Sequence, residues 1–295
     1  MMPMRSQSAL EYLTTYGWAL LIIAIVFFVL FELNVLNVGN QGYALPGSCS
    51  VVSSGTPGTN QFLSFEGTCN GAVPKFVSDL SNHGYVTTPN MTAFHNLNSF
   101  TVIVWVARKG STGTTEPVLA SNGTILPNFD LLINESGSNS ATFGAMGASG
   151  YSGAASSSSN SLAALQDWYF LAGTYNTSSV SIYVDGALAG SSGTTLSGLS
   201  ANGNITAQIG HSYSSPLQYF DGYVTNVQIY DRQLSPSEIQ TTFREGIGGL
   251  PIDLNGLVAW YPLNGNPNDY SQAKLNGMAT NVIYSSSWLS TTKLP

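Results

Sequence analysis

One apolar run near the N-terminus constrains this chain more than any other feature of its sequence. Residues Tyr12 to Phe31 carry no charge and include the run Ala19-Leu-Leu-Ile-Ile-Ala-Ile-Val-Phe-Phe-Val-Leu-Phe31. An α-helix of about twenty residues spans the ~30 Å hydrocarbon core of a bilayer. A secretory signal peptide would need a small-residue cleavage site after the run, and Phe31-Glu-Leu-Asn-Val-Leu-Asn37 contains none. The run is therefore predicted to stay in the mature protein as a hydrophobic α-helix.

The residues before the apolar run read Arg5-Ser-Gln-Ser-Ala-Leu-Glu-Tyr-Leu13. This segment resembles the class III signal peptide of archaeal type IV pilins. The resemblance implies that a prepilin peptidase cuts between Ser6 and Gln7, which separates a leader (1–6) from a transmembrane or filament-core helix (7–38). The chain departs from the family in having Ser6 where a glycine often precedes the cut.

Glu11 would be the fifth residue of the cleaved chain. A carboxylate beside an apolar helix is costly in lipid and should have a partner. The pilin resemblance implies that Glu11 pairs with the N-terminal amine of a neighbouring copy, with help from a membrane assembly machinery. The alternative is that Glu11 reaches water at the membrane edge of a monomeric anchor.

Composition excludes one class of partner. The chain of 295 residues has a net charge of −7, and its eight Lys and Arg are scattered singly along it. No electropositive groove can be assembled from them, so nucleic acid is not an expected partner.

The segment 39–75 is rich in Gly, Ser and Pro and is predicted to be a connector with short strands. It contains both cysteines of the chain, Cys49 and Cys69. An even cysteine count in an extracytoplasmic protein indicates a disulfide, and two free thiols are the alternative.

From residue 76 the chain consists of apolar segments separated by turn residues. Apolar and polar residues alternate in several segments, and Asp185-Gly186 is typical of a tight turn. This pattern predicts an all-β antiparallel sandwich. The main predicted strands are Ser99–Ala107, Phe129–Ile133, Trp168–Tyr175 and Val180–Val184.

A series of motifs gives this region a family resemblance. They are Gly84-Tyr-Val-Thr-Thr-Pro89, Asp167-Trp-Tyr-Phe-Leu-Ala-Gly-Thr-Tyr175, Phe220-Asp-Gly-Tyr-Val-Thr-Asn-Val-Gln-Ile-Tyr230 and Arg232-Gln-Leu-Ser-Pro-Ser-Glu-Ile-Gln240. Their order resembles a laminin-G-like, concanavalin A-like domain, which implies a jelly-roll sandwich over 76–248.

Two finer structural predictions follow for this region. Ser235-Pro-Ser-Glu238 is a capping pattern and predicts a short helix to Phe243. Six large side chains are predicted to fill the space between the two sheets. They are Trp105, Trp168, Phe170, Tyr183, Val227 and Ile229.

The C-terminal segment, 249–295, resembles the strand that opens such a domain in the family. The resemblance lies in Gly256-Leu-Val-Ala-Trp-Tyr-Pro-Leu-Asn-Gly-Asn-Pro-Asn-Asp269. The favoured interpretation is a strand that pairs within its own chain. The alternatives are donation to a neighbouring subunit and a truncated second repeat.

The sequence predicts no enzyme. The Glu-x-Asp-x-Glu strand of glycan hydrolases with this fold is absent, and Glu116 and Glu135 are expected near turns without partner carboxylates. His83, His95 and His211 have no metal-ligand spacing, and the cysteines fit no zinc pattern. No resident cofactor is therefore expected.

The laminin-G resemblance implies a Ca²⁺ or sugar site at one rim. The candidate Ca²⁺ ligands are Asp79, Asn82 and Asn226. The site is a weak one, because Asn226 stands where many relatives carry an acid. The alternative is that they are turn residues that bond their own backbone. Three tyrosines in Ser- and Gly-rich loops are candidates for stacking on sugars or for subunit contacts. They are Tyr151, Tyr213 and Tyr219.

Five Asn-x-Ser/Thr sequences are candidate glycosylation sites and agree with a surface location. They begin at Asn90, Asn122, Asn134, Asn176 and Asn204.

These features together predict a cell-surface filament subunit. The N-terminal helix would assemble copies of the chain, and the sandwich would contact glycans, proteins or cell surfaces. The alternative is a monomeric, membrane-anchored, lectin-like protein that does not polymerise.

Overall fold

The computed structural model describes Ile22, 50–53, 63–66, 73–76, 83–92, 97–110, 114–123, 128–134, 138–147, 150–164, 167–194, 205–212, 218–247, 249–263 and 265–285. The predicted leader and, apart from Ile22, the predicted N-terminal helix lie outside these residues. So do Ser6, Gln7, Glu11, Cys49 and Cys69. Within the described residues, no helix has the length and apolar character needed to cross a membrane.

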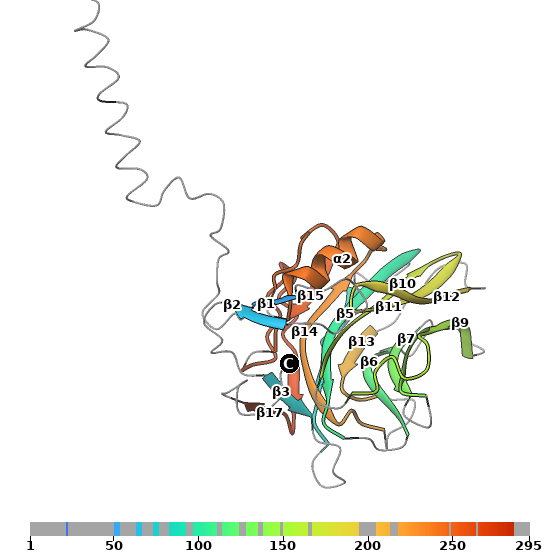
Figure 1. The fold of residues 1–295 in the computed structure, drawn as a ribbon, viewed down its shortest axis with the longest axis horizontal. Helices are drawn as coiled ribbons and strands as arrows, with labels where there is room; N and C mark the ends of the chain where they lie inside the picture. Colours follow the sequence, from blue (N-terminus) through green and yellow to red (C-terminus); the bar gives the residue numbers. More distant parts are fainter. Residues whose placement is uncertain are drawn as a thin grey trace, which may run out of the picture. The chain divides into compact units, whose positions relative to one another are not determined.

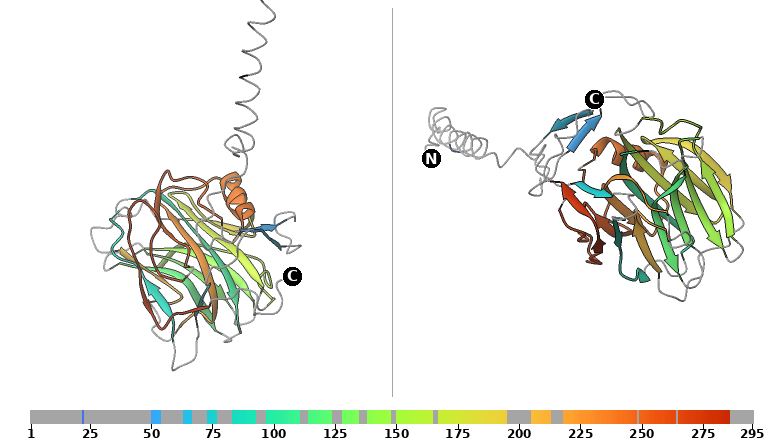
Figure 2. Two further views of the ribbon diagram at one scale, coloured as in Figure 1. Left: turned by 90° about the vertical axis from the view of Figure 1, so that its left-hand side faces the viewer. Right: turned by 90° about the horizontal axis from the view of Figure 1, so that it is seen from below.

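Two antiparallel sheets form the body of the domain, which confirms the predicted sandwich (Figures 1 and 2). The larger sheet has eight strands in the order β12-β11-β10-β5-β14-β3-β17, and β15 also pairs with β14. Its strands are β3 (Val73–Phe76), β5 (Ser99–Arg108), β10 (Trp168–Asn176), β11 (Ser179–Val184), β12 (Ala187–Gly193), β14 (Gly222–Tyr230), β15 (Leu257–Tyr261) and β17 (Ile283–Ser285).

The second sheet has seven strands in the order β16-β4-β13-β6-β7-β8-β9. They are β4 (Tyr85–Thr87), β6 (Thr115–Gly123), β7 (Asn128–Asn134), β8 (Ser140–Gly147), β9 (Gly150–Ser156), β13 (Ile205–Ile209) and β16 (Met278–Thr280). A separate two-stranded sheet is formed by β1 (Ser50–Ser53) and β2 (Leu63–Glu66).

Strand β5 lies at the centre of the larger sheet, between β10 and β14, and both of its faces are buried. Its valines Val102, Val104 and Val106 belong to the core between the sheets, where they meet residues of the second sheet such as Leu131 and Phe143. Ile103 and Trp105 point to the other face of the same sheet. A second apolar layer must therefore cover that face.

The cover is helix α2 (Pro236–Glu245), which follows β14 (Figure 1). Its Phe243 stacks on Trp105 with ring centroids 5.7 Å apart, and Phe170 meets both rings edge-on. The helix begins at the predicted capping box, in which Ser235 and Glu238 bond each other's backbone N–H groups.

The prediction for the core is therefore correct for two residues and wrong for four. Val227 and Ile229 lie between the sheets. Trp105, Phe170 and Tyr183 lie under α2, and Trp168 is half-buried against the same cluster. The physical reason is that strands buried on both faces give no alternation from which to tell inside from outside.

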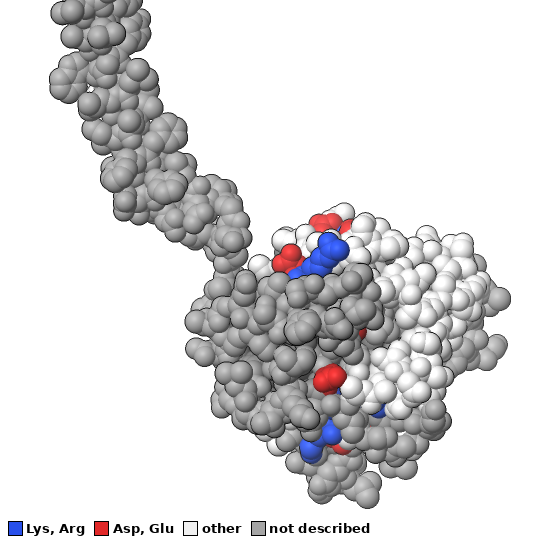
Figure 3. All heavy atoms as spheres, in the orientation of Figure 1, with Lys and Arg blue, Asp and Glu red and all other residues white. Residues whose placement is uncertain are grey.

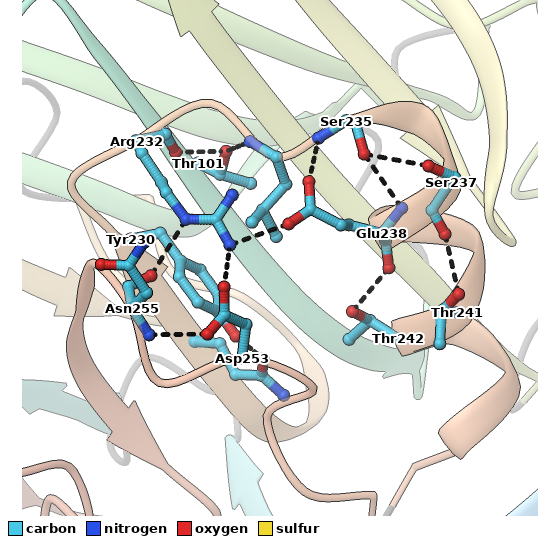
Figure 4. A network of polar contacts seen from close by, with 12 residues as sticks. Thr101, Tyr230, Arg232, Ser235, Ser237, Glu238, Thr241, Thr242, Asp253 and Asn255 are labelled. Atoms are coloured by element: carbon cyan, nitrogen blue, oxygen red, sulfur yellow. Dashed lines mark hydrogen bonds and ion pairs between the residues drawn. The ribbon is translucent and has the colours of Figure 1, made fainter.

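Arg232 ties the C-terminal segment to the beginning of α2 (Figure 4). Its guanidinium Nη2 lies 2.8 Å from a Glu238 oxygen and 2.7 Å from an Asp253 oxygen, and its Nε donates to the Asn255 carbonyl. The backbone carbonyl of Arg232 accepts from Thr101 of β5. The side chain of Arg232 thus joins the helix to the segment that leads to β15, and its backbone carbonyl adds a bond to the central strand.

The C-terminal segment is an integral part of both sheets. β15 pairs with β14, β16 pairs with β4, and β17 pairs with β3. The favoured interpretation, in which this segment pairs within its own chain, is confirmed by these ladders.

Gly173 of β10 marks a place where the two sheets pack very closely. A Cβ atom at this position would lie 2.3–2.6 Å from ring atoms of Phe143 in β8. The ring therefore occupies the space that any side chain at residue 173 would need.

We expect Gly173→Ala to destabilise the domain by about 1–3 kcal/mol, because the ring of Phe143 must move within a close-packed core. Urea unfolding of the full-length protein measures the change. Gly193→Ala is the matched control, since its Cβ would have its nearest neighbour at 4.0 Å. Equal stability of the two variants would contradict this account of the core.

The hydrogen bond from Arg232 holds the pKa of the Glu238 carboxyl at about 2, below its ordinary 4.5. A lowered native pKa contributes stability above the unfolded value, and this contribution is lost as the pH falls from about 4.5 to about 2. We expect Glu238→Gln to be less stable than wild type at neutral pH, with a difference that closes across this window.

Unfolding curves of both proteins at a series of pH values test this expectation. Glu245→Gln is the control, because within the described part of the chain Glu245 forms no ion pair. A Glu238→Gln difference that persists unchanged at pH 2 would exclude the ion pair as its source.

Candidate functional site, a cluster of rings beside the seven-stranded sheet

Four ring side chains gather where β4 and β13 lie side by side. Tyr85 begins β4 and His83 lies two residues before it, while His211 and Tyr219 face each other in an isolated antiparallel bridge after β13. Val86 points into the core, so the alternation along β4 places Tyr85 and Thr87 on the outer face of the sheet. We call these four residues the ring cluster.

Tyr219 is the central ring of this cluster. Its centroid lies 3.8 Å from that of His83 and 4.4 Å from that of His211, and both pairs are stacked. Two imidazoles at these distances cannot share one face of the phenol ring, so Tyr219 is held between them. Tyr85 packs at a tilt against His211 and Tyr219, at 5.3 and 6.3 Å.

The outer part of the cluster is accessible. His211 is 8% exposed, whereas His83, Tyr85 and Tyr219 are half-buried. His83 ends the stack on the accessible side. The ring faces and edges of the cluster are therefore accessible to a ligand, and the rings are already held in place by packing on one another.

Polar groups border the rings. The His211 Nδ1 is hydrogen-bonded to the Gln208 side-chain oxygen, and the Gln208 amide nitrogen donates to the Thr87 hydroxyl at 3.5 Å. Gln208 is 3% exposed and holds His211 in place from the interior. The partly exposed hydroxyl of Thr87 and the ring faces beside it match the alternating polar and apolar surface of a sugar.

Of this cluster, only Tyr219 is predicted from the sequence as a possible sugar contact. His83 and His211 have no metal-ligand spacing in the sequence. Within the described residues, no three His, Cys, Asp or Glu side chains come together as a metal site. His95 and Glu135 lie outside the described residues, and Glu116 is buried as the second residue of β6.

Asn226 is committed to the interior of the protein. It sits at a bulge in β14 with φ 49°, its side-chain oxygen accepts from Trp260 Nε1 and Gln228 Nε2, and its amide donates to the Gly249 carbonyl. These bonds attach β15 to β14. The other two Ca²⁺ candidates, Asp79 and Asn82, lie outside the described residues.

The predicted glycosylation candidates differ in the hydrogen bonds that their side chains form. Asn134 and Asn176 donate their amides to Thr142 and Gln233, whereas the side-chain oxygen of Asn90 accepts from the Ile205 backbone. The side chain of Asn122 and all of Asn204 lie outside the description. Tyr213 and the side chain of Tyr151 do so as well.

A raised carboxyl pKa can indicate a catalytic acid, and Asp185 has one. Burial raises its pKa to about 6. However, Asp185 forms the β11–β12 turn, its oxygen accepts from the Phe170 backbone, and the adjoining Gly186 packs against Phe243. Burial of Asp185 beneath α2 is therefore sufficient to explain its raised pKa.

The two sheets define an antiparallel β-sandwich, and comparison with known proteins gives its family. A family model described as the concanavalin A-like lectin/glucanases superfamily matches residues 80–240, more than half of the chain. The chain belongs to this superfamily. No curated protein sequence matched it significantly.

Solved structures share the fold at low sequence identity. A candidate carbohydrate-binding protein from Bacteroides ovatus is 15% identical, with a TM-score of 0.56 over 76% of this chain and 63% of that one. A heptameric SAP-like pentraxin from Limulus polyphemus is 12% identical, with a TM-score of 0.53 over 75% of this chain and 98% of that one. The chain thus spans less than two thirds of the Bacteroides protein.

Proposed function

We propose that the sandwich is a glycan-binding module and that the ring cluster is its binding site. The observation that carries this proposal is the stack of His83, Tyr219 and His211, with Tyr85 beside it, on a half-exposed surface. Rigid rings offer a contact area that loses little conformational entropy on binding. The carbohydrate-binding description of the Bacteroides protein agrees with this proposal at the level of the fold.

Charge favours an uncharged glycan as the ligand. The chain has no Lys or Arg from residue 110 to residue 231, a range that includes strands β6 to β9 and β13. Figure 3 shows a wide uncharged area over β10 to β12 on the face that it displays. Carboxylate and sulfate groups are usually bound by Arg or Lys, so sialylated and sulfated glycans lack a matching partner on these strands.

We expect Tyr219→Ala to weaken glycan binding more than about tenfold, because both imidazoles lose the ring on which they stack. An array of neutral, sialylated and sulfated glycans, probed with full-length protein, identifies the ligand, and titration measures affinity. Tyr270→Ala is the control, since Tyr270 is 38% exposed and packs on Trp260 of β15. Absence of any binding, or equal binding by the two variants, would reject the site.

We propose further that the N-terminal segment assembles the chain into a surface filament. The support is the sequence alone: the pilin-like leader, the cleavage position between Ser6 and Gln7, and Glu11 at the start of the apolar run. In this proposal the helix is the assembly element and the sandwich is displayed for binding. Binding without hydrolysis is proposed because the sequence lacks the paired carboxylates of glycan hydrolases.

We expect Glu11→Ala to abolish or strongly reduce filaments, because the acid would no longer pair with the amine of a neighbouring copy. Electron microscopy of shear fractions from the native host measures assembly, and N-terminal sequencing shows whether the chain begins at Gln7. Glu32→Ala, at the other end of the apolar run, is the control. Normal filaments from Glu11→Ala would contradict the role of Glu11, and a protein found only as membrane-bound monomers would favour the anchored alternative.

A further inference from the structure

The C-terminal segment forms one side of the ring cluster. β16 pairs with β4 so that Thr280 lies opposite Tyr85 and Met278 lies opposite Thr87. β4 is only three residues long and has just two ladder positions with β13, at Gln208 and Ile209. Without β16, the strand that carries Tyr85 would be a short edge strand with weak support.

Asn281, directly after β16, holds the outermost ring residue. Its side-chain amide donates to the His83 carbonyl at 3.3 Å, and its backbone adopts φ 52°, a conformation that Asn tolerates better than most residues. Two residues further on, β17 pairs with β3 of the other sheet. The turn around Asn281 is therefore fixed at both ends, by β16 in one sheet and by β17 in the other.

β16 is itself anchored to the domain. The Asp269 carboxylate is 2% exposed and accepts from the backbone N–H groups of Trp260, Ser271 and Leu275. The Gly277 N–H donates to the Pro267 carbonyl, and a Cβ at Gly277 would lie 2.7 Å from Val86 of β4. The segment therefore packs on β4 with no room to shift.

We propose that the C-terminal strands are part of the glycan site and that Asn281 is a positioning residue for His83. These residues lie beyond the part of the chain that matches the family model, 80–240. Asn281 acts through the backbone of His83, whose ring ends the stack on Tyr219. The inference rests on the proposed function of the ring cluster, but its structural part can be tested without a ligand.

The test uses Asn281→Asp in the full-length protein. Aspartate keeps the size of the side chain and tolerates a positive φ, but it cannot donate to the His83 carbonyl. Asn160→Asp is the matched control, because Asn160 is exposed, also has a positive φ (60°), and only accepts through its side chain. NMR spectra with selectively labelled histidine report the ring environment of His83, with signals assigned through single His→Gln variants.

We expect Asn281→Asp to shift the His83 ring signals, which the stacked Tyr219 ring influences, and to weaken binding of the neutral glycan about five- to tenfold. The unfolding midpoint should stay within about 2 °C of wild type, and Asn160→Asp should change none of these quantities. Unchanged His83 signals would overturn the positioning role. Shifted signals with unchanged affinity would overturn the role in binding. If the wild type binds no glycan, the proposed function fails, and the His83 signals still decide the positioning role.

Discussion

Burial of β5 on both faces is the constraint on which the rest of the domain depends. Its valines pack against the second sheet, while Ile103 and Trp105 form an apolar surface on the outer face of the larger sheet. Exposure of that surface to water would be unfavourable. Helix α2 covers that surface, and Arg232 fixes the chain between β14 and α2 to the segment that leads into β15. The C-terminal segment follows α2 in the chain and returns to pair with β14 through β15.

The same topology creates the candidate site. With α2 on the outer face of the larger sheet, the ring cluster lies on the other sheet, where β4 and the bridge after β13 bring His83, Tyr85, His211 and Tyr219 together. The tail then completes that edge through β16. The C-terminal segment thus has two roles in this chain, since β15 extends the larger sheet and β16 supports the ring cluster.

Much of the fold could be predicted because its signals are local. The apolar runs in residues 99–107 and 180–184, the Asp185-Gly186 turn and the Ser235–Glu238 capping box all depend on near neighbours in the chain. The side to which Trp105 points could not be predicted, because both faces of its strand are apolar. The ring cluster was missed for another reason: His83 and Tyr219 are 136 residues apart, and nothing in either local sequence indicates the other. The outward position of Tyr85 beside the core residue Val86 was the one signal available.

The sequence by itself determined the all-β class, the positions of β5, β7, β10 and β11, the capped helix and the absence of basic residues from 110 to 231, because composition and short-range patterns encode them. The leader and filament role proposed for the N-terminal segment rest on the sequence alone. Tertiary structure decided which face α2 covers, which rings stack and where the tail pairs. These outcomes depend on contacts between residues far apart in the chain, which form only when both sheets are in place.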